Sequence, residues 1–191
     1  MPTRAELVDT LATSQTQVLA FFQGLSPHVL ERPATASEVP GAAPWCAKDH
    51  FAHLVKSERN RQRLLRATRV GETRDALLRL QYPAGMPLPG TLGDWDVLTP
   101  EEQERLALAV DNLNQAYVDA HHGDTLETIS ADFLAARQDT VDLLRQFTDE
   151  QLAAVVPTVV GEQTVGDVFG WGVGHPSDHM TWIEEGLRQG I

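Results

Sequence analysis

Two histidines one helical turn apart are the residues whose types and spacing most clearly suggest chemistry in this chain. His175 and His179 lie in the segment His-Pro-Ser-Asp-His, and at positions i and i+4 of a helix they share one face. Imidazole nitrogen is a ligand for zinc, nickel, copper and iron. Two surface or partly buried histidines with a structural role are the alternative, and the motif alone does not choose between the two.

The residues around His175 are unfavourable in a helix. The stretch 170–174 reads Gly-Trp-Gly-Val-Gly, and each glycine costs about 1 kcal/mol relative to alanine. Pro176 lacks the N–H that would bond to the carbonyl of Gly172, so we expect a kink or bulge there. An unfavourable sequence beside two histidines favours a functional site. Close helix packing against the glycines is the alternative.

A metal site needs a further ligand from elsewhere in the chain. The other histidines are His28, His50, His53, His121 and His122. His50 and His53 lie near the start of one predicted helix. The apolar stripe of this helix lies closer to His50 than to His53, but the angular position of a histidine on a helix does not by itself show which of the two binds a metal. The pair at 121–122 is explained by a polar helix end, where histidine suits the helix dipole.

Amphipathic helices must position these histidines. Apolar residues recur at helical spacing in five segments, and none shows the alternation of a strand. The segments begin near Thr3, Trp45, Thr99, Thr125 and Thr164. They end near Ser26, Val70, His122, Phe147 and Arg188. Long amphipathic helices without strands predict an all-α bundle.

The connections differ greatly in length. Residues 33–44 form a predicted loop rich in proline, alanine and glycine, and Thr148 to Gln151 resembles the cap of a short extra turn. Residues 71–98 are irregular, apart from a short helix expected over 73–80. Breakers in that stretch include Met86-Pro87, Leu88-Pro89-Gly90 and Gly93. A connection of this length is expected to cover a site or to cross the bundle.

Composition limits the class of protein. The 191 residues are 42% apolar, which predicts one domain over 1–191 with a sizeable core. Net charge is −12, from 15 basic and 27 acidic residues, so we expect neither nucleic acid nor an anionic membrane as a partner. Cys46 stands alone, which excludes an intramolecular disulfide and a four-cysteine zinc site. No signal-peptide core is present, so we expect a cytoplasmic protein.

The motifs together resemble the DinB-like superfamily of helical bundles. They are Trp-x-x-Lys-Asp-x-x-Ala-His-Leu at 45–54, Thr-Val-Gly-Asp at 164–167 and the His-x-x-x-His at 175–179. That group includes YfiT-like metal-dependent hydrolases, bacterial thiol S-transferases and mycothiol-dependent maleylpyruvate isomerases. The resemblance spans nearly the whole chain, including Asp111-x-x-Asn114 and 147–152. It implies a four-helix bundle of DinB/YfiT-like type, with an additional helix and a long loop in the crossover between helices 2 and 3.

Carried over by position, the resemblance assigns the metal ligands to His53, His175 and His179. His50 occupies a place that is usually apolar in the family, so it either supports a ligand or belongs to the core. Cys46 stands where the family commonly has serine or threonine. A buried structural cysteine is favoured there over a reactive thiol.

Three imidazoles leave positions open on a divalent ion, which is typical of a catalytic site. With zinc or nickel bound, the resemblance implies a metal-dependent transferase or hydrolase that acts on a small electrophile, with a low-molecular-weight thiol as a candidate co-substrate. Candidate helpers are Asp49, Glu58, Asn114 and Asp178, for which plain helix-surface roles are the alternative. A non-catalytic bundle that binds metal or a small ligand, such as a stress-response dimer, is the competing hypothesis. A homodimer is expected in either case.

Overall fold

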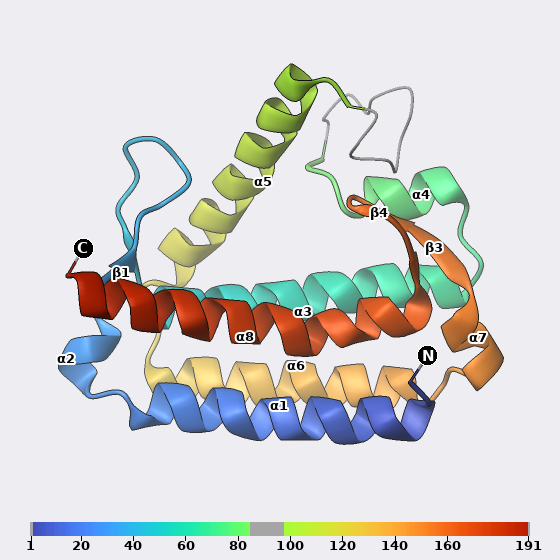
Figure 1. The fold of residues 1–191 in the computed structure, drawn as a ribbon, viewed down its shortest axis with the longest axis horizontal. Helices are drawn as coiled ribbons and strands as arrows, with labels where there is room; N and C mark the ends of the chain where they lie inside the picture. Colours follow the sequence, from blue (N-terminus) through green and yellow to red (C-terminus); the bar gives the residue numbers. More distant parts are fainter. Residues whose placement is uncertain (1, 85–97, 191) are drawn as a thin grey trace.

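Four long helices lie side by side in the computed structural model, which describes residues 2–84 and 98–190 (Figure 1). They are α1 (Arg4–Gly24), α3 (Ala47–Arg69), α6 (Leu126–Leu144) and α8 (Val165–Gln189). α3 and α1 each pack against both α6 and α8. The arrangement confirms the all-α bundle that was predicted from the helical periodicity and the resemblance.

A fifth long helix, α5 (Pro100–His121), packs against α3 and leans away from the other four (Figure 1). It is the additional helix that the resemblance implied. The described residues also form three short helices: α2 (Pro27–Leu30), α4 (Arg74–Arg79) and α7 (Asp149–Ala153). α4 and α7 confirm the two short helical segments that were expected. The predicted breakers at 86–90 and at 93 lie outside the described residues.

Threonine caps explain where most of the helices begin. The side chains of Thr3, Thr99, Thr148 and Thr164 each accept a hydrogen bond from a backbone N–H three residues on. In each case the glutamate, aspartate or glutamine at that later position reaches back to the cap. These reciprocal bonds satisfy N–H groups that the first helical turn leaves without partners.

Two small antiparallel strand pairs correct the expectation of a chain without strands. β1 (Pro33–Thr35) pairs with β2 (Trp45–Cys46), and β3 (Val155–Thr158) pairs with β4 (Gly161–Thr164). Strands this short contain too few residues to show alternation. β1 packs closely on α8, because a Cβ at Gly186 would lie 1.5 Å from the carbonyl oxygen of Ala34. This contact fixes β1 beside the histidines of α8.

The bundle core has two apolar halves with a buried polar layer between them. One half centres on Leu11, Leu65 and Phe169, and the other on Phe22, Phe51 and Phe133. The polar layer takes Ser14 from α1, Glu58 from α3, Arg137 from α6 and Gly172 from α8. No helix within 2–84 or 98–190 has the length and apolar character that a membrane span requires.

Candidate metal centre

Imidazole rings from α3 and α8 meet at one place. His53 of α3 and His175 and His179 of α8 each offer a ring nitrogen, and these atoms all lie within 4.8 Å of one another. Nε2 of His53 is 3.2 Å from Nε2 of His175. His53 and His179 are buried and His175 is half-buried. The structure therefore brings together the histidines that the resemblance assigned to a metal.

The spacing and hydrogen bonding of these rings fit a divalent ion. Nitrogens about 2.1 Å from one ion lie roughly 3.0 to 3.4 Å apart at adjacent positions, and the His53–His175 separation of 3.2 Å falls in this range. The widest spacing, up to 4.8 Å, requires the rings to close in slightly. Among the described residues, Nε2 of His179 is buried without a hydrogen-bond partner. Such an atom costs about 1–3 kcal/mol, which coordination would offset.

His50 supports the cluster from behind. Its Nδ1 lies 2.7 Å from Nδ1 of His179, and its Nε2 lies 2.9 Å from Oγ1 of Thr35. If His179 uses Nε2 for a metal, its proton is on Nδ1 and is donated to His50, whose own proton then lies on Nε2 and is donated to Thr35. One direction of hydrogen bonding thus satisfies all three side chains and leaves Nε2 of His179 free.

Burial keeps the imidazoles neutral. Loss of hydration lowers the pKa of His50 to about 4, of His53 to about 3 and of His175 to about 4. The pKa of His179 is lowered as well, first by burial and then by the neighbouring histidines. Neutral imidazole is the form that binds a metal, so at neutral pH the rings need not release a proton before they bind an ion.

Asp49, which was proposed as a helper of the metal site, contacts the ends of two helices. Its carboxylate accepts a hydrogen bond from the backbone N–H of Cys46 at 2.9 Å, and it lies 2.9 Å from Nδ1 of His122. Asp49 therefore caps α3 and links it to the end of α5. Burial, together with Asp49, raises the pKa of the Cys46 thiol to about 12. The thiol is protonated at neutral pH, which favours the structural interpretation of Cys46.

Polar groups from α3, α5 and α8 surround the histidines. Ser57 Oγ lies 3.2 Å from Nε2 of His53. Asn114 accepts a hydrogen bond from Nζ of Lys56 at 2.8 Å, and burial lowers the pKa of that lysine to about 8. Asp178 is exposed, and its charge acts on His175. Asn114 and Asp178 thus lie near the histidines, and their roles as a polar wall and as an orienter of a ligand stay predictions.

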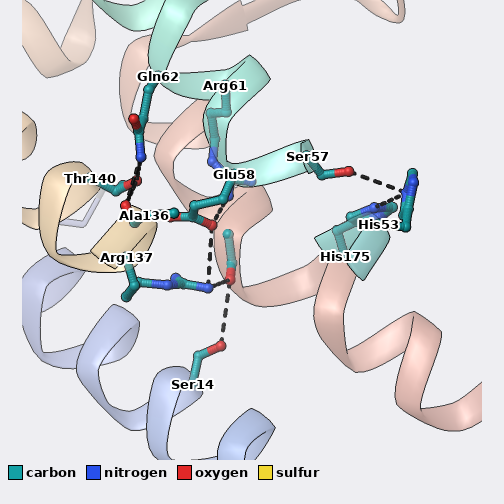
Figure 2. Close-up of polar contacts among 11 residues, drawn as sticks. Ser14, His53, Ser57, Glu58, Arg61, Gln62, Ala136, Arg137, Thr140 and His175 are labelled. Atoms are coloured by element: carbon teal, nitrogen blue, oxygen red, sulfur yellow. Dashed lines mark hydrogen bonds and ion pairs between the residues drawn. The ribbon is translucent and has the colours of Figure 1, made fainter. Parts of the chain in front are cut away.

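Glu58 belongs to the buried polar layer, together with two arginines. Its carboxylate pairs with Arg61 on the next turn of α3 and, at 3.4 Å, with Arg137 of α6 (Figure 2). Glu58 and Arg137 are almost fully buried. Burial lowers the pKa of Arg137 to about 10, which still leaves the side chain charged at neutral pH. The layer therefore holds two positive charges and one negative charge.

Pro176 explains how α8 is bound into this layer. Proline offers no N–H to the carbonyl of Gly172 one turn earlier. Arg137 Nη2 donates to that oxygen at 2.8 Å, and Ser14 Oγ donates at 3.4 Å (Figure 2). A Cβ at Gly172 would lie 3.0 Å from Arg137 Nη1, so the glycine makes room for the arginine. α8 runs without interruption from 165 to 189. The side chains of Arg137 and Ser14 donate hydrogen bonds to the carbonyl that the proline leaves without a backbone partner.

Two cavities open on the histidine cluster. The first, of about 440 Å³, lies beside the segment that follows β1. Its wall includes the aromatic and acidic side chains of Trp45, Trp182, Glu38 and Asp111. The second, of about 680 Å³, lies beside the end of α4 and the β3–β4 turn, and Arg61 contributes to its wall. His53, His175 and Asn114 line both cavities, so the cluster is accessible from two sides.

Sequence reasoning missed several residues that contribute to this region. They are Thr35, Ser57, Arg61 and Arg137, and the place of His50 was left open. A signal for Ser57 is its position one turn after His53. A signal for Arg137 is its place at an inward position of α6, where an apolar residue is expected. Charged residues on an apolar stripe are rare unless they are paired.

Comparisons with known proteins agree with this fold. The model of the DinB superfamily matches residues 40–183, more than half of the chain. No curated protein matches this chain. An uncharacterised protein from Escherichia coli UTI89 has a similar crystal structure, with a TM-score of 0.64 at 12% identity, covering 99% of this chain and 95% of that one. The colibactin self-resistance protein ClbS, solved in complex with double-stranded DNA, has a TM-score of 0.64 at 12% identity, covering 100% and 99%.

The ClbS complex corrects one expectation. Net charge was taken to exclude nucleic acid as a partner, and this exclusion is wrong, because a protein with this fold has been solved with double-stranded DNA. Net charge is a sum over the whole surface, whereas binding depends on the charge of one local patch. On the family match over 40–183 and the shared fold, the chain belongs to the DinB superfamily.

Proposed function

We propose that this protein is a metal-dependent enzyme that acts on a small electrophile, with zinc or nickel held by His53, His175 and His179. Superfamily membership and the clustered histidines support a metal site. Three protein ligands leave coordination positions open, which is characteristic of catalytic zinc. The chemistry that such an ion supplies is Lewis acidity toward water, a thiol or a carbonyl oxygen.

The single observation that carries the proposal is the position of the histidine cluster between two cavities. His53 and His175 line both of them, so two small molecules could reach the same centre from different sides. This favours transfer of a thiol to an electrophile, with hydrolysis as the variant in which water takes the place of the thiol. Trp45 and Trp182 give the first cavity apolar surface that would exclude water from a bound molecule.

The side chains of this site would bind and orient the reactants. His50 holds the ring of His179 by the 2.7 Å contact and so presents its other nitrogen to the cluster. Lys56, whose pKa is lowered to about 8 by burial, can lose or donate a proton near neutral pH. Its hydrogen bond to Asn114 holds that amine beside a residue that lines both cavities.

The test combines elemental analysis with a turnover screen. Untagged protein, purified without immobilised nickel, is expected to contain about one zinc or nickel ion per chain, and to lose it in His53→Ala and His179→Ala. Metal-loaded protein is then assayed for transfer of small thiols to monochlorobimane. His122→Ala is the matched control, because His122 is mostly exposed and pairs with Asp49 away from the cluster. Equal metal content in all four proteins would refute the site.

A non-catalytic metal-binding bundle is the second candidate function, favoured by the same cluster. It predicts stoichiometric metal that depends on the histidines, together with a blank result in a broad screen of thiols, electrophiles and hydrolase substrates. Turnover that disappears in His53→Ala and His179→Ala, but persists in His122→Ala, would exclude this candidate.

Double-stranded DNA is a further candidate partner, favoured by the ClbS complex. Arg63, Arg66 and Arg69 are exposed on one face of α3 and form a local basic patch on an acidic protein. Fluorescence anisotropy with a labelled duplex at low salt is expected to show binding that weakens as salt rises. Arg63→Gln with Arg66→Gln is expected to weaken it further. No binding at low salt would exclude DNA as a partner.

A further inference from the structure

The second cavity has a buried guanidinium in its wall whose charge is incompletely neutralised. Arg61 is 7% exposed and lines this cavity. Its partner Glu58 is 1% exposed and also pairs with Arg137. Two guanidiniums therefore share one carboxylate, and one positive charge is left over in this layer among the residues that the structure describes. A surplus charge held away from water favours binding of an anion.

The other groups that face this cavity do not cancel that charge. Neither His53 nor His175 can supply negative charge, since imidazole is neutral or cationic, and the carboxylate of Asp178 is exposed to solvent, which weakens its effect on Arg61. Much of the remaining wall is apolar. Its apolar side chains include Leu64, Leu80, Val110, Val159, Val160 and Trp171. The space therefore suits a molecule with an apolar body and one anionic group.

Two glycines of α8 keep the cavity open. Gly170 and Gly174 line it one turn apart, and a Cβ at either position would meet no atom within 4 Å. Neither is needed for close packing, unlike Gly172, where a Cβ would come within 3.0 Å of two side chains. A glycine inside a helix costs about 1 kcal/mol relative to alanine. The cost of two such glycines, both facing one cavity, is explained if a bound molecule occupies that cavity.

We propose that the second cavity binds the carboxylate of an anionic substrate, with Arg61 as the partner of the carboxylate. The body of the substrate would lie along the apolar wall, and its reactive end would face His53 and His175. This inference names a substrate class for the proposed function and rests on it for the role of the histidines. The anion site itself requires no metal, so each of the two ideas can fail separately.

The test compares a carboxylate with its neutral analogue on the metal-free full-length chain. Benzoate and benzamide are titrated separately, and binding is followed by the NMR amide shifts of Gly170 and Gly174. Benzoate is expected to bind about ten- to a hundredfold more tightly than benzamide, the usual effect of a hydrogen bond to a charged group. Metal-free protein is used because a carboxylate can also coordinate an ion.

Three variants assign any preference to the cavity. Arg61→Gln is expected to remove it, whereas Arg59→Gln, which changes an arginine about half exposed on the same helix, is expected to keep it. Gly170→Leu places a side chain in the cavity at a position where a Cβ meets no atom within 4 Å, and it is expected to abolish binding of both probes, even if Arg61→Gln does not fold. The proposal is overturned by absence of benzoate binding, by equal affinities, or by a preference that survives Gly170→Leu.

Discussion

Replacement of His50 tests whether a histidine outside the metal set controls the affinity for metal. His50→Leu removes the acceptor for Nδ1–H of His179, now at 2.7 Å, and the donor to Thr35, now at 2.9 Å. The ring of His179 then loses both its fixed orientation and its preferred tautomer. Loss of such a supporting hydrogen bond typically weakens metal binding by about ten- to a hundredfold, or roughly 1.4–2.7 kcal/mol.

The assay is competition for zinc between the protein and a chelator of known affinity. Thr35→Val breaks only the outer hydrogen bond of this pair, so a smaller loss of about fivefold is expected. His122→Leu serves as the matched histidine control and is expected to leave the affinity unchanged. Wild-type zinc affinity in His50→Leu would refute the reasoning. Loss of zinc in His50→Leu but not in His53→Ala would instead make His50 the ligand.

Three further results are expected. Glu58→Gln leaves two buried guanidiniums without their carboxylate and is expected to lower the free energy of unfolding in urea by about 3–5 kcal/mol, whereas a loss below 1 kcal/mol would contradict the charge assignment. Because burial lowers the pKa of His50 and His53 to about 4 and about 3, stability of the metal-free protein is expected to be full above about pH 6.5 and to fall as the pH drops toward 3–4. The measurement is the free energy of unfolding from urea titrations at a series of pH values. If this free energy depends on pH as steeply in His53→Ala as in the wild type, the dependence does not come from His53. Cys46, with its pKa raised to about 12, is expected to react with Ellman's reagent only after unfolding, and rapid reaction of the folded protein would show an accessible thiolate.

The helices could be predicted because their signals are local. Apolar spacing and threonine caps depend on residues within a few positions of each other, and Thr3, Thr99 and Thr164 each cap a helix that was expected to begin beside them. The strand pairs depend on contacts between segments, such as Ala34 against Gly186. No local pattern of two to four residues carries that information.

The candidate site was predictable only in part, for a related reason. Periodicity could not choose between His50 and His53, because every residue from 46 to 55 is buried and this stretch of α3 has no solvent face. The resemblance named His53, and the structure places it in the cluster with His175 and His179. Arg137 was missed because an amphipathic pattern assigns charge to the surface. Its partners, Glu58 and the carbonyl of Gly172, lie on other helices.

The carbonyl of Gly172 has a consequence for how this protein can change by mutation. It accepts from Arg137 because Pro176 provides no backbone donor. Pro176→Ala would supply that donor and make Arg137 dispensable for this oxygen, so Arg137→Met should be far better tolerated after the proline has gone than before. The two positions are therefore expected to show epistasis, and evolutionary or laboratory paths through them depend on the order of the steps.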